Sequence, residues 1–109
     1  MLTITNTDIA LTRGDTARIE VSITTEDGTA FYPSDGDSVR FACKRDCDDL
    51  RCLFVKEIPN DTLILEIEPE DTKDLNFGEY VYDIQLTYAN GDVDTFIPPS
   101  KFIVEKEVD

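Results

Sequence analysis

The sequence predicts an all-β protein, built as an antiparallel β-sandwich of seven to eight strands with almost no helix. Three observations support this prediction. Apolar and polar residues alternate with a period of two along most of the chain, as in strands that are buried on one face. Clusters of turn-forming residues recur after about ten residues, which is the spacing of short strands in sandwiches and barrels. One short stretch, residues 69–75, breaks this period and favours a single helical turn.

The length and composition fit one folded domain. The chain has 109 residues, of which 40% are hydrophobic, and this length accommodates a single core. We therefore expect one domain over residues 1–109, with its core over about 8–104. The 24 Asp and Glu residues oppose 10 Lys and Arg residues, so the net charge is −14. This charge argues against nucleic-acid and membrane partners, because both attract clustered cations.

The first half of the chain contains three strand-like segments. They are residues 9–11, 18–24 and 39–44, separated by turn signals at residues 13–15, 26–28 and 32–37. In the second of them, Ile19, Val21 and Ile23 alternate with polar residues, which predicts one buried face. The Asp-Gly pair at residues 27–28 predicts the turn that ends it.

The second half contains the strongest strand pattern. Its expected strands are residues 50–58, 63–68, 80–88, 93–97 and 102–104. The residues of one face of the third of these are Tyr80, Tyr82, Ile84, Leu86 and Tyr88. The pair Asn90-Gly91 predicts a hairpin that leads into residues 93–97. Pro98-Pro99 is expected to end that strand or to bend it at a sheet edge.

The residues around the helical turn predict a structural corner. Asp71, Leu75, Gly78 and Tyr80 form a one-turn loop, a glycine and then a strand that opens with tyrosine. Immunoglobulin-like sandwiches use this arrangement to tie the loop to the sheet through the tyrosine hydroxyl. We expect structural roles for these four residues, with a sugar-binding tyrosine surface as the alternative.

The cysteines form an incomplete zinc pattern. Cys43, Cys47 and Cys52 include one spacing that zinc sites use, but a structural zinc needs four sulfur or nitrogen ligands, and the chain has no histidine. We expect Cys43 to face the core, Cys47 to lie in an exposed loop, and the thiols to be reduced.

Four aspartates are candidates for calcium. Asp35, Asp37, Asp46 and Asp48 lie in two loops, but the sequence lacks the spacing and the closing glutamate of an EF-hand loop. Turn formation explains these aspartates without a metal. We therefore expect neither a metal site nor a cofactor.

One further motif carries function only in another context, and the groups that catalysis needs are missing. Arg13-Gly14-Asp15 is the tripeptide that integrins recognise on mobile loops, but here it matches a tight turn between strands. The sequence has no histidine that could act as a base beside Ser or Cys, and no glycine-rich loop that could bind phosphate precedes a helix. We expect a protein that is not an enzyme.

Several of these segments together resemble a known family. They are Thr12 to Thr16, Tyr32 to Lys44, Ile58 to Leu63, Pro69 to Leu75, Gly78 to Gln85 and Gly91 to Thr95. In this succession the chain resembles small immunoglobulin-like proteins of bacteriophage and prophage tails and baseplates, with the layout of baseplate upper protein N-terminal domains. The resemblance covers residues 12–104. It implies an immunoglobulin-like sandwich, and, because no receptor-binding module follows Asp109, an accessory, adaptor or decoration protein.

The leading hypothesis is a non-enzymatic virion component that docks through a sheet edge or face onto other structural proteins, with a homo-oligomer as one form that this docking can take. The absence of a signal-peptide pattern or a long apolar run favours assembly in the bacterial cytoplasm and then a place in the virion. A first alternative is an inhibitor that mimics nucleic acid, if the acids at residues 46–49 and 66–74 meet on one face. A second is a carbohydrate-binding module that uses Phe31, Tyr32 and Tyr88.

Overall fold

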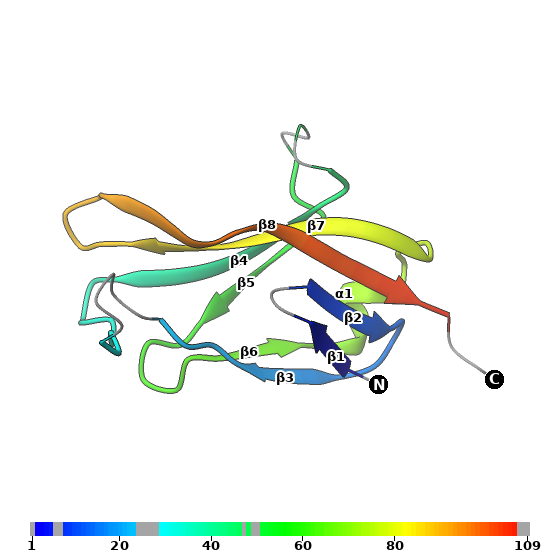
Figure 1. The fold of residues 1–109 in the computed structure, drawn as a ribbon, viewed down its shortest axis with the longest axis horizontal. Coiled ribbons are helices and arrows are strands. Elements are labelled where there is room, and N and C mark those ends of the chain that lie inside the picture. Colours follow the sequence, from blue (N-terminus) through cyan, green and yellow to red (C-terminus); the bar gives the residue numbers. More distant parts are fainter. Residues whose placement is uncertain (1, 6–7, 24–28, 47, 49–50, 107–109) are drawn as a thin grey trace.

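The eight strands form two sheets that pack against each other (Figure 1). The computed structural model describes residues 2–5, 8–23, 29–46, 48 and 51–106. The elements are β1 (Leu2–Thr5), β2 (Asp8–Thr12), β3 (Ala17–Glu20), β4 (Ser38–Lys44), β5 (Phe54–Ile58), β6 (Ile64–Ile67), α1 (Pro69–Thr72), β7 (Gly78–Thr87) and β8 (Val93–Glu105). The larger sheet has the order β1-β2-β8-β7-β4-β5, and the smaller sheet pairs β3 with β6. The all-β, sandwich-like fold that the sequence predicts is confirmed.

Four adjacent strands of the large sheet follow the order found in one sheet of a variable-type immunoglobulin sandwich. In such domains, this sheet contains the last two strands, called F and G, together with strand C and the strand C′ that follows it. Here β8, β7, β4 and β5 occupy these places, and β3 and β6 form the opposite layer. The corner α1 then leads from the small sheet back to the large one, immediately before β7.

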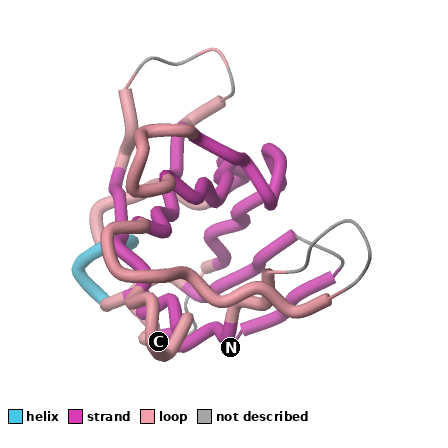
Figure 2. Tube along the Cα trace, turned by 90° about the vertical axis from the view of Figure 1, so that its left-hand side faces the viewer, coloured by secondary structure: helices cyan, strands magenta, loops and turns pink. Residues whose placement is uncertain are grey.

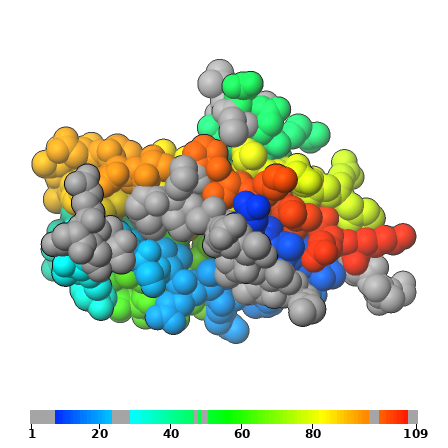
Figure 3. Space-filling model, in the orientation of Figure 1, coloured from blue at the N-terminus to red at the C-terminus, as the bar shows by residue number. Residues whose placement is uncertain are grey.

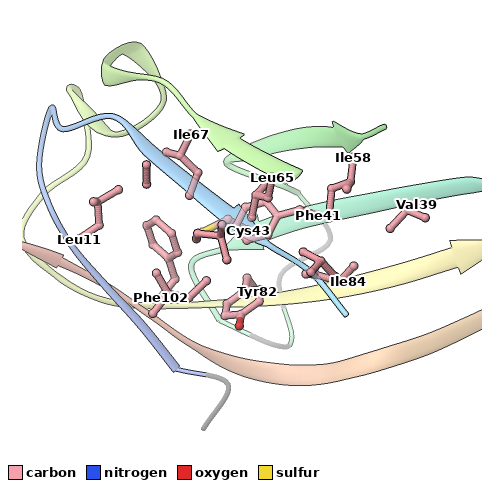
Figure 4. Packing of buried hydrophobic residues seen from close by; sticks show 14 of the residues in the cluster. Leu11, Val39, Phe41, Cys43, Ile58, Leu65, Ile67, Tyr82, Ile84 and Phe102 are labelled. Carbon is pink, nitrogen blue, oxygen red and sulfur yellow. The ribbon is translucent and has the colours of Figure 1, made fainter. Parts of the chain in front are cut away.

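The core lies between the two layers (Figure 4). Phe41, Tyr82 and Phe102 come from three adjacent strands of the large sheet, and their ring centroids are 5.1–6.5 Å apart. Leu65 and Ile67 project towards them from β6 and are fully buried. Offset and edge-to-face ring pairs add stability beyond the area that they bury. The alternation predicted for residues 39–44 and 80–88 therefore places the expected side chains in the core.

One strand pair differs from the antiparallel arrangement that the sequence predicts. β2 runs parallel to β8, with Ile9 opposite Phe102 and Leu11 opposite Val104. β2 lies beside the last strand, next to the edge that β1 forms, instead of joining β3 in the small sheet. The residues β2 buries, Ile9 and Leu11, extend the core at that edge.

Of the two outcomes expected at Pro98-Pro99, an end of the strand is wrong, whereas a bend within it agrees with the irregular pairing there. β8 is continuous, because the two prolines oppose the single residue Asp83 between the pairs Tyr82–Ser100 and Ile84–Ile97. A bulge of this kind tolerates residues that lack an N–H group, so the strand bends without ending.

The sequence prediction also misses β1, which pairs with β2 as an antiparallel hairpin. β3 is shorter than predicted, but Val21 and Ile23 stay buried beyond its end. The predicted turn at residues 26–28 lies outside the described residues. The Asn-Gly hairpin is confirmed, with Gly91 at a φ of 96° and the Tyr88 N–H bonded to the Asp92 carbonyl at 2.8 Å.

Candidate interaction surface

The corner residues lie together beside α1. The Tyr80 hydroxyl donates a hydrogen bond to the Asn76 carbonyl at 2.7 Å, as a corner tyrosine does. An Asp71 carboxylate oxygen accepts the Glu68 N–H at 2.8 Å and also lies 3.0 Å from the Lys56 ammonium. Leu75 packs against the core, and Gly78 has a φ of 143°, which favours glycine. These contacts are structural, and the Tyr80 ring is buried.

The Arg13-Gly14-Asp15 tripeptide is packed against the same corner. The Arg13 guanidinium lies 4.2 Å from the centre of the Phe77 ring and donates to the Leu75 carbonyl at 3.3 Å. The Gly14 N–H donates to the hydroxyl of Thr72, a fully buried side chain, at 2.9 Å. Integrin recognition needs a mobile, projecting loop. Here the tripeptide forms a turn and fastens the start of the chain to α1.

The calcium candidates do not converge. Asp35 and Asp37 precede β4, whereas Asp46 and Asp48 follow it, so the two pairs are separated by a seven-residue strand of about 23 Å. Asp37 already accepts the N–H groups of Ser34 and Ala89 through its two oxygens, at 2.9 and 3.0 Å. Within the described part of the chain, no three acidic or cysteine side chains group as metal ligands.

Gly36 makes possible the tight turn of residues 34–37, which precedes β4. Its φ is 92°, and a Cβ at this position would lie 3.0 Å from the Cβ of Ala89. The Asn60 amide also donates to the carbonyls of Ser34 and Asp37, at 3.2 and 2.8 Å. The turn therefore joins two other loops at this end of the sandwich.

The cysteines lie on different sides of the large sheet. Cys43 points into the core, where burial and, to a lesser extent, the nearby Cys52 raise the pKa of its thiol to about 12. Cys52 lines a hollow on the outer side of the sheet. Cys47 lies outside the described residues. A thiol with such a high pKa is a poor nucleophile and a poor metal ligand at neutral pH.

The aromatic residues weighed for sugar binding divide into two groups. Phe31 and Tyr88 pack edge to face, with centroids 6.3 Å apart, and both are partly buried against the core. The Tyr32 side chain is 73% exposed. It borders a groove of about 270 Å³ whose polar side chains include Glu20 and Asp61.

The two acidic clusters do not form one stripe. Asp46 and Asp48 belong to the loop after β4, which projects from the outer side of the large sheet (Figures 1 and 3). Residues 66–74 run from the end of β6 through α1, below that sheet. The side view also places α1, in cyan, well below this loop (Figure 2). A continuous acidic stripe, which a mimic of nucleic acid requires, does not join these two clusters.

The most distinctive surface is the outer face of the large sheet, on the side away from β3 and β6. Along β4, the residues that alternate with the buried Val39, Phe41 and Cys43 are Arg40, Ala42 and Lys44. Their neighbours on adjacent strands include Val55 and Val81. Leu53 and Val55 are two of the five large hydrophobic residues that are exposed in the described structure. An apolar centre with polar neighbours is typical of surfaces that bind other proteins.

The small side chain of Ala42 leaves a depression in this face. A hollow of about 140 Å³ is lined by Arg40, Ala42, Lys44, Cys52, Asp83 and Gln85, and we call it the basic hollow. Two cations and one carboxylate line it. A second hollow of about 60 Å³ adjoins it near Val81 and Pro99.

Sequence reasoning missed this surface, because polar residues at outward strand positions are common. The sequence did contain one signal of this surface. Two cations and an alanine, Arg40, Lys44 and Ala42, stand at outward positions of β4, although the chain has 24 acidic residues. No protein-family model matches this chain, and no curated protein is significantly similar to it. No helix among the described residues is long and apolar enough to cross a membrane.

Proposed function

We propose that this protein is a non-enzymatic structural or accessory component of a phage or prophage virion, as a tail, baseplate or decoration protein. It acts by docking on other structural proteins through the outer face of its large sheet. The observation that carries this proposal is the combination of exposed Leu53 and Val55 with the cations of the basic hollow on one sheet face. The virion as the setting rests on the resemblance of residues 12–104 to tail and baseplate proteins.

The rest of the molecule supports docking by a face. β4 lies between β7 and β5, so its backbone is paired on both sides and its outward side chains stand on a rigid support. The opposite side of the same sheet is fully used by the core. Partners are therefore offered a preformed surface, which lowers the conformational entropy lost on binding.

The test is mass spectrometry of particles purified from the source strain. The expected result is that this protein co-purifies with the particles at a fixed ratio to the known structural proteins. A companion strain carries the double variant Val55→Asp and Ala42→Glu, and we expect it to lose the protein from particles while keeping its cellular level. Consistent absence of the wild-type protein from particles would refute the proposal.

A second candidate function is carbohydrate binding at Tyr32. An exposed aromatic ring beside carboxylates can stack on a sugar ring while Glu20 and Asp61 accept its hydroxyl groups. The measurement is binding of the protein to purified cell-wall polysaccharide of the host bacterium. Tyr32→Ala should abolish that binding, whereas Tyr32→Phe should retain it. Equal binding by Tyr32→Ala would remove this candidate.

A further inference from the structure

The basic hollow and the β6–α1 segment carry opposite charges on different sides of the molecule. We infer that copies of this protein assemble head to tail, with residues 66–74 of one copy, its acidic segment, docked at the basic hollow of the next. This inference rests on the proposed function and deepens it, because it names a second copy of the chain as a partner of the outer face.

The cations of the basic hollow have no ion-pair partner among the described residues. Within the described part of the chain, Arg40 and Lys44 take part in no ion pair, although the full sequence has 24 acidic residues. Three other cations are paired: Arg18 with Glu66, Lys56 with Asp71 and Lys101 with Glu79. The cations of the hollow are thus available for carboxylates from another molecule.

Their geometry suits a carboxylate. Arg40 and Lys44 lie about 13 Å apart along the same side of β4, with Ala42 between them, so both long side chains can reach over it. The hollow of about 140 Å³ exceeds several times the roughly 30 Å³ share of one water molecule, so a carboxylate group fits. Gln85 offers a further hydrogen-bond donor. Asp83 also lines the hollow, so its charged side chains are two cations and one carboxylate.

The acidic segment supplies the complementary charge. Residues 66–74 contain Glu66, Glu68, Glu70, Asp71 and Asp74 against Lys73, so their formal charge is 1 − 5 = −4. Glu70 and Asp74 are exposed and make no ion pair within the described structure. Because the two surfaces are different, the contact is heterologous and produces a ring if it closes or a filament if it does not.

Salt gives this assembly a characteristic signature. At about 0.01 M salt the screening length is about 30 Å, longer than two of the three axes of the molecule (45, 27 and 23 Å), so much of the −14 of each copy repels the other. At about 0.15 M the screening length is about 8 Å, so remote charges are screened and contacting charges still attract. At about 1 M it is about 3 Å, and the contact is weakened too. Assembly should therefore be strongest at intermediate salt.

The experiment is sedimentation velocity of the pure protein at these three salt concentrations. Two charge-reversal variants accompany the wild type: Arg40→Glu with Lys44→Glu, and Glu70→Lys with Asp74→Lys. We expect the wild-type sedimentation coefficient to rise above the monomer value at intermediate salt and to fall at both extremes. Each variant alone should stay monomeric. An equimolar mixture should assemble again, because each reversed surface then meets its complement.

The rescue by mixing separates the proposed contact from misfolding, since unfolded variants cannot restore each other. Three results overturn the inference: a wild type that is monomeric at all three salt concentrations, an assembly that strengthens continuously with salt, or a mixture that stays monomeric. The proposed function has an independent readout. A monomeric protein that is nevertheless found in particles leaves that function standing and removes only the contact between copies.

Discussion

Replacing Tyr80 by phenylalanine removes one hydroxyl from the corner and leaves the buried ring in place. The lost interaction is the hydrogen bond to the Asn76 carbonyl at 2.7 Å, and a bond of this kind contributes about 0.5–1.5 kcal/mol net. Asn76 itself is exposed, so water can reach its carbonyl, and we expect a loss of about 1 kcal/mol. With an unfolding entropy of about 2.1 cal/mol/K per residue over 109 residues, this loss lowers Tm by about 4 °C.

The assay is equilibrium unfolding in urea, together with thermal unfolding, followed by circular dichroism. Tyr32→Phe is the matched control, because it removes the same hydroxyl from a side chain that is 73% exposed. The urea midpoint of Tyr80→Phe should fall without a change in m, whereas Tyr32→Phe should stay within about 0.5 kcal/mol of the wild type. Equal stability of Tyr80→Phe and the wild type would refute the role of the corner. So would an equal loss in Tyr32→Phe.

Three further predictions concern other buried or bonded groups. Thr72→Val removes the acceptor of the Gly14 N–H and should cost about 1–3 kcal/mol in urea unfolding, while Thr72→Ser should retain most of the stability. Asp37→Ala removes the acceptor of two exposed backbone N–H groups, to which water can bond instead, so it should cost about 0.5–1.5 kcal/mol, whereas a chelator should leave the wild-type Tm unchanged. Burial raises the pKa of the Cys43 thiol from 9.0 to about 12 and that of the Tyr82 hydroxyl from 10.0 to about 12. Their contribution to stability is therefore complete below pH 9 and is lost as the pH rises towards 12, and Cys43→Ala should flatten the dependence of the urea midpoint between pH 9 and 10.

The sequence predicts those features that local patterns determine. The alternation along β7 identifies the inward face from Tyr80 to Leu86, because a period of two fixes which side chains share a face. The turn at Asn90-Gly91 follows from the positive φ that Gly91 adopts. The buried position of Cys43 follows from the same alternation in β4.

Features that depend on distant partners could not be read from local patterns. The parallel pairing of β2 with β8 joins residues that are more than 90 positions apart, and periodicity gives no information about such partners. The continuity of β8 depends on β7, which accepts Pro98 and Pro99 as a bulge opposite Asp83. The basic hollow depends on the order of β7, β4 and β5 in the sheet, which places Asp83 and Gln85 beside Ala42 and Arg40.

The positions that carry the proposed docking are separate from those that carry stability. Arg13 and Gly14 donate hydrogen bonds to Leu75 and Thr72 at the corner. None of these four residues belongs to β4, whose outer face carries the basic hollow. Arg40 is exposed and stands opposite Glu57 in the strand register without an ion pair, so Arg40→Glu places two like charges opposite each other and costs about 0.2–1 kcal/mol. This cost is small against the 5–15 kcal/mol that stabilises an ordinary domain. Charge reversal in the hollow should therefore change assembly while the sandwich stays folded, which makes the mixing experiment a test of the contact itself.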